Sequence, residues 1–98
     1  MEHTAVDTPA MVDVGRALGR VSDDLDREIA DAATAIAAIA ASWHGAAASA
    51  FADGWATVHH GAREMVAVLA ESARTLEVAA TMYAQQDEST AAAVAGAS

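Results

Sequence analysis

The chain has 98 residues, of which 29 are alanine and one is proline, and its 14 acidic residues outnumber its five arginines to give a formal net charge of −9. Phosphate backbones and anionic membrane surfaces bind clustered Lys or Arg, so this balance argues against nucleic acid and disfavours an anionic membrane surface as partners. The lack of cysteine excludes a disulfide framework. One small all-α domain is expected, because alanine is the best helix former and is depleted in strands.

The chain begins MEHTAVDTPAMVDV, which lacks the basic region and apolar core of a cleavable signal peptide. We expect residues 1–7 to be disordered. The longest stretch of alanine and isoleucine, residues 35–41, is too short to cross a bilayer, so no membrane insertion is predicted.

A first helix is predicted over residues 8–42. Asp7 followed by Thr8 and Pro9 is typical of a helix start, with a capping side chain before an early proline. Apolar residues then recur three or four positions apart, which places them on one helix face. They are Met11, Val14, Leu18, Val21, Leu25, Ile29, Ile36 and Ile39.

A turn is predicted at residues 43–45, where the sequence is Trp43-His44-Gly45. Gly45 suits the left-handed conformation that ends a helix. Trp43 is then the last large residue of the first helix, and we expect it to lie across the start of the second helix and fix the angle of the bend.

A second helix is predicted over residues 46–88, and residues 89–98 are expected to form a disordered tail. Its apolar stripe continues for five heptads, which indicates packing of coiled-coil character. Gly54 and Gly61 flank this stripe and are either points of close approach by another helix or incidental exposed glycines. The stripe comprises Ala48, Phe51, Trp55, Val58, Ala62, Met65, Leu69, Ser72, Leu76, Ala79 and Tyr83.

The short connection predicts an antiparallel hairpin. Residue numbers that face each other across it should sum to about 88–90, so that the last turns of the second helix overhang the first. Two helices that share one seam leave apolar surface in water, which predicts a dimer of hairpins built as a four-helix bundle. The residues expected in the hairpin or dimer seam are Leu18, Leu25, Phe51, Trp55, Val58, Met65, Leu69 and Leu76.

No catalytic, cofactor or metal site is predicted. Adjacent helical residues point about 100° apart, so His59 and His60 cannot share an ion. No pairing of a nucleophile with a base is present, and a narrow hairpin offers no substrate pocket.

Two motifs give the chain a resemblance to a known family. Trp43-His44-Gly45 at the midpoint of a chain of about 100 residues, between two amphipathic helices, resembles the turn of the WXG-100 family. Tyr83-Ala-Gln-Gln-Asp87 is similar to the C-terminal Tyr-xxx-Asp/Glu export signal of that family. Together the motifs and helices cover about residues 8–88.

The resemblance implies a non-enzymatic substrate of a type VII (ESX) secretion system. Such proteins pair with themselves or with a related hairpin, are exported as folded dimers, and are engaged at the C-terminal part by an ATPase of the secretion machine. In the family, the Tyr-xxx-Asp segment of one subunit lies near the Trp-X-Gly turn of the other. The protein would be made in the cytoplasm and secreted without a cleavable signal peptide. Its alanine-rich, lysine-free composition fits an actinobacterial source.

Two alternatives remain open. The hairpin could be a dedicated targeting partner or chaperone that stays bound to a larger type VII effector. It could also be an unrelated acidic coiled-coil adaptor of the cytosol.

Overall fold

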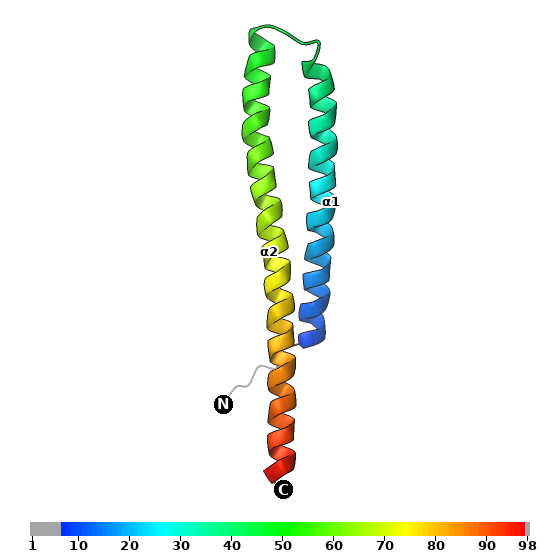
Figure 1. The fold of residues 1–98 in the computed structure, drawn as a ribbon, viewed down its shortest axis with the longest axis vertical. Helices are drawn as coiled ribbons and strands as arrows, with labels where there is room; N and C mark the ends of the chain where they lie inside the picture. The colour runs from blue at the N-terminus through cyan, green and yellow to red at the C-terminus, as the bar shows by residue number, and fades with distance from the viewer. Residues whose placement is uncertain (1–6, 98) are drawn as a thin grey trace.

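Two antiparallel helices joined by a short connection make up the computed structural model, which describes residues 7–97 (Figure 1). Helix α1 spans Thr8–Ala40 and helix α2 spans Ala46–Ala97. The molecule is a thin rod of 80 × 24 × 14 Å. The predicted all-α hairpin is confirmed.

The start of α1 follows from its capping sequence. The Asp7 carboxylate accepts a hydrogen bond from the backbone N–H of Ala10 at 3.0 Å, which satisfies one of the amides that a helix start leaves free. Asp7 therefore caps α1, as its place before Thr8 and Pro9 predicts, and it is not part of a disordered segment, as was expected for residues 1–7. The rest of that assignment, residues 1–6, lies outside the described residues.

The connection spans residues 41–45 and is slightly longer than predicted. Helix α1 ends at Ala40, where the N–H of Ala41 still donates to the Ala37 carbonyl at 3.2 Å. Gly45 has a φ of +106°, which L side chains rarely adopt. Its carbonyl accepts the Ser49 N–H at 3.1 Å, so the glycine opens α2 instead of ending α1.

The C-terminal end of α2 differs from the prediction. The helix was expected to stop near residue 88, before a disordered tail, but it continues to Ala97. Residues 89–97 are mostly alanine and contain no proline. Because adding a residue to a formed helix is far easier than starting one, an alanine-rich segment extends the helix without needing a packed face. The last turns of α2 therefore project well beyond the start of α1 (Figure 1).

The register of the hairpin is fixed by two contacts across the seam. The Ser22 hydroxyl donates to the Val66 carbonyl at 3.3 Å, and Arg63 lies 3.6 Å from the Asp26 carboxylate. These residue numbers sum to 88 and 89, within the predicted range.

The seam between the helices is built around small residues. The buried positions are Gly15, Ser22, Ala73 and Ala80. A β-carbon at Gly15 would lie 3.4 Å from the Ala73 carbonyl oxygen, so the two backbones approach closely here. Close approach favours side chains that occupy little space between the axes.

The residues predicted for the hairpin or dimer seam differ in their exposure within the single hairpin. Leu18, Leu25, Trp55, Leu69 and Leu76 are half-buried. Phe51, Val58 and Met65, in contrast, are 44%, 60% and 59% exposed. The apolar stripe of α2 is wider than the contact with α1. The two helices meet along the edge of this stripe that carries small residues, so these three larger side chains point outward.

Candidate interaction surface

Six of the outward-turned apolar residues, drawn from both helices, lie on one side of the hairpin. Val21 immediately precedes the seam residue Ser22, and Met65 immediately precedes Val66. Both helices are right-handed and they run in opposite directions. The residue that precedes a seam position therefore points to the same side of the hairpin on each helix. We call this side the apolar face. It comprises the exposed residues Val14, Val21, Ile39, Phe51, Val58 and Met65.

The hairpin exposes more surface than a compact chain of its mass. The chain has an accessible surface of 7235 Å², whereas a compact monomer of 9.9 kDa is expected to expose about 5200 Å². The excess, about 2000 Å², is larger than the ~800 Å² that each partner contributes to a standard protein–protein interface. The hairpin thus has enough surface for a stable partner.

The Trp-X-Gly segment packs against the first turns of α2. The Trp43 ring lies 5.5 Å from the Phe51 ring, centroid to centroid, and Trp43 remains 41% exposed. Trp43 therefore does contact the start of the second helix, as expected, but from the connection and not from the end of the first helix. Its exposed part leaves aromatic surface available to a partner.

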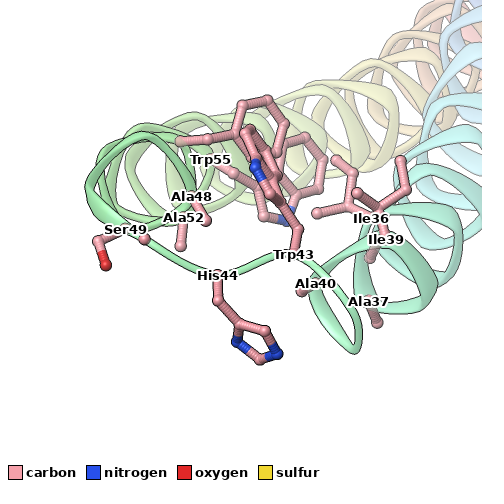
Figure 2. Close-up of a pocket in the computed structure, with 13 residues that line it drawn as sticks. Ile36, Ala37, Ile39, Ala40, Trp43, His44, Ala48, Ser49, Ala52 and Trp55 are labelled. Carbon is pink, nitrogen blue, oxygen red and sulfur yellow. The ribbon is translucent and has the colours of Figure 1, made fainter.

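A cavity of about 450 Å³ lies beside this aromatic pair, where the two helices diverge toward the turn (Figure 1). Ile36 and Ile39 border it from α1, and Trp55 borders it from α2 (Figure 2). His44 points away from these rings (Figure 2). The lining is mostly aliphatic and aromatic, so the cavity suits an apolar side chain.

Tyr83 and Asp87 lie near the opposite end of the rod. From Gly45 to Tyr83 there are 38 residues, which is about 57 Å along a helix at 1.5 Å per residue. Tyr83 is 45% exposed. Asp87 is also exposed, and the hairpin register places it beyond Thr8, where α1 begins. The structure therefore does not bring the two motifs together within one chain.

Gly54 and Gly61 flank the apolar face on α2. No atom lies within 4 Å of a β-carbon built at either glycine. The other helix of the hairpin therefore does not approach them, and any close approach at these positions would come from a partner.

The titratable groups of residues 7–97 form no recognisable chemical centre. His60 lies 3.2 Å from Glu64 on the surface, whereas the His59 ring packs 5.4 Å from the Trp55 ring, so the adjacent histidines point to different surroundings. No group of three or more potential metal-binding side chains occurs within residues 7–97. No helix in that range has both the length and the apolar character to cross a membrane.

The sequence prediction missed the residues that bring the helices together, namely Gly15, Ser22, Ala73 and Ala80. The sequence nevertheless contains a pattern that could have identified these four residues. Gly15 and Ser22 are seven residues apart, as are Ala73 and Ala80, and small residues at heptad spacing mark a close helix contact.

Comparison with known proteins identifies one family. The family described as "WXG100: Proteins of 100 residues with WXG" matches residues 3–88. No curated protein matches the chain. The matched segment includes both helices up to Glu88, the Trp43-His44-Gly45 turn and the Tyr83-to-Asp87 segment.

Proposed function

The chain belongs to the WXG100 family, and on that premise we propose that it is a non-enzymatic type VII secretion substrate that is exported as a folded pair of hairpins. The family supports a small type VII substrate in general. We further propose that the protein is exported as a pair and that the secretion ATPase engages its C-terminal end.

The placement of the two motifs carries this proposal. The Trp43 turn and the Tyr83–Asp87 segment lie at opposite ends of a rod 80 Å long. A signal composed of both motifs therefore requires a second hairpin that runs antiparallel to the first. Such a partner would cover the apolar face and bring its own C-terminal segment to the aromatic cavity at the turn.

The projecting end of α2 supports recognition by the secretion machine. Tyr83 and Asp87 are four residues apart and thus lie on one helix face. Asp87 lies past the start of α1, so a receptor can reach it without separating the two helices. A folded hairpin can therefore present the signal.

The proposal is tested by export from the native host. Asp87→Ala should fold normally, because it removes an exposed side chain, and it should accumulate in cells and disappear from the medium. Tyr83→Ala should behave similarly, with a modest loss of stability. Glu88→Ala is the matched control, since it removes the adjacent exposed acid outside the motif, and it should be exported. Normal export of folded Asp87→Ala would show that the Tyr-xxx-Asp match is coincidental.

If the hairpin is instead a targeting partner, a different protein should be recovered with it in the same export experiment. A hairpin that escorts a larger effector would be recovered with that effector, and the apolar face would be covered by a helical domain of the effector. Recovery of native protein from the medium with a second chain of about 100 residues would favour the substrate function.

A further inference from the structure

We propose that the cavity beside the turn is a binding site for a small, uncharged aromatic molecule. Its volume is about 450 Å³, and small-molecule sites in proteins span about 300–1,000 Å³ and are often lined by apolar and aromatic side chains between helices. Such a site goes beyond the proposed export function and does not depend on it. In the proposed pair a partner segment reaches the same cavity, so the molecule would bind the hairpin before it pairs.

The cavity lies where the two helices separate. Gly15 and Ala73 let the backbones approach closely near the other end of the seam. Close to the turn, a register sum of 88 instead places the bulky, half-buried Trp55 at the level of Ala33, and the distance between packed helices depends on the side chains at the contact. The helices diverge there (Figure 1), and the alanines of the lining are too short to close the space. They are Ala33, Ala37, Ala40, Ala48 and Ala52.

Three aromatic rings border the cavity. The rings of Trp43 and Phe51 lie 5.5 Å apart and are tilted by 48°, and Trp55 borders the cavity one helical turn after Phe51. Trp43 and Phe51 are both partly exposed, so a molecule from solvent can reach them. Aromatic rings attract one another in tilted or offset arrangements beyond the gain from buried area. The lining therefore favours a flat aromatic ligand.

The surroundings of the cavity offer no ionic partner to a charged ligand. Residues 32–52 contain no Asp, Glu, Lys or Arg. Among the described residues that line the cavity, His44 is the one titratable group, and it points away from the rings (Figure 2). A charged molecule would lose water without gaining an opposite charge, which is strongly unfavourable. The ligand that fits this site is therefore uncharged.

Both tryptophans of the chain report on this cavity. The sequence contains two, and Trp43 and Trp55 both line the cavity. In a proton–nitrogen NMR spectrum of the isotope-labelled chain, their indole N–H groups give two signals apart from the backbone amides. A molecule that enters the cavity should shift these two signals.

Titration of the isolated full chain with acetylnaphthalene tests the proposal. This probe is uncharged and aromatic, and naphthoate is the matched probe because a carboxylate replaces its acetyl group. The titrations are done at pH 7 in about 0.5 M salt, which screens the repulsion between naphthoate and the acidic chain. Both indole signals should shift saturably with acetylnaphthalene, and its Kd should be at least tenfold lower than that of naphthoate. Equal Kd values for the two probes would overturn the assignment of an uncharged ligand.

Variants that fill the cavity provide a second test. Ala33→Leu enlarges a half-buried side chain of the lining, so it should raise the Kd for acetylnaphthalene at least tenfold. Ala35→Leu is the matched control, because Ala35 is exposed and lies outside the lining, and its Kd should be unchanged. Ala48→Leu, with Ala47→Leu as its control, repeats the comparison on α2. Circular dichroism checks that each variant keeps its helix content.

Three results would show that the cavity is not such a site. The first is an unchanged Kd in both folded lining variants, or an equal rise in their controls. The second is an equal shift of the amides of Val68, Val78 and Met82, which are exposed outside the lining, since this would mean general adsorption to apolar surface. The third is no shift of either indole signal, including in a chain whose own association covers the cavity. None of these results bears on export, which Asp87→Ala tests separately.

Discussion

The close contact at Gly15 can be tested by comparing it with Gly19 in the same helix. A β-carbon at Gly15 would lie 3.4 Å from the Ala73 carbonyl oxygen, Leu76 Cβ and Glu77 Cγ, whereas one at Gly19 would have no atom within 4 Å. Replacing glycine by alanine within a helix contributes about 1 kcal/mol. Since 3.4 Å is an ordinary contact distance, alanine should fit at both positions and stabilise the hairpin by similar amounts.

Substitution by leucine should affect stability differently at Gly15 and at Gly19. At Gly19 its extra atoms have open space, so the stabilisation should remain. At Gly15 they must displace the backbone of α2 or its side chains, and overpacking of this kind costs about 1–3 kcal/mol. For a domain of this size each kcal/mol shifts the midpoint of thermal unfolding by about 4–8 °C.

The assay is thermal unfolding of the four variants, followed by circular dichroism at one fixed protein concentration because pairing would make the midpoint concentration-dependent. Gly15→Leu should melt well below Gly19→Leu, while the two alanine variants melt together. Equal midpoints for the leucine variants would refute the close approach of the helices at Gly15.

Substitutions at three further positions test the turn and the first cap. Trp43→Ala should destabilise the protein by about 2 kcal/mol, roughly half the loss for a fully buried tryptophan, and an unchanged midpoint in urea would mean that the contact with Phe51 contributes nothing to folding. Gly45→Ala should cost at least about 1 kcal/mol because its φ is +106°, and it should lower the urea midpoint without changing the slope; equal stability would contradict the left-handed conformation. Asp7→Ala should cost about 1 kcal/mol through the lost bond to Ala10, whereas Asp7→Asn should retain most of the stability, and equal melting of both variants would refute the cap.

The hairpin was predictable because its signals are local and repeated. Spacings of three and four residues identify both helices, and the short connection sets their antiparallel register. The left-handed conformation of Gly45 also follows from the residue type. The motifs themselves could be located by position, since Trp43 falls at the midpoint and Tyr83 falls near the end of the second stripe.

The side of each stripe that faces the other helix could not be predicted from hydrophobicity. Val58 is more hydrophobic than Ala73, yet Val58 is exposed and Ala73 is buried, because close packing of two backbones selects for small size. The end of α2 was missed for another reason. Residues 89–97 contain neither a core-facing pattern nor a helix-stopping proline, and their alanines continue the helix with no contact to α1.

The near absence of fully buried side chains in the hairpin has a calorimetric consequence. The heat capacity change of unfolding arises mainly from apolar surface that becomes hydrated, and it averages about 12–15 cal/mol/K per residue for globular proteins. Only Ala73 and Ala80 form the buried apolar core of the described residues, so unfolding of the isolated hairpin should yield a smaller value per residue. Association with a partner should instead show a negative heat capacity change, because it removes the apolar face from water.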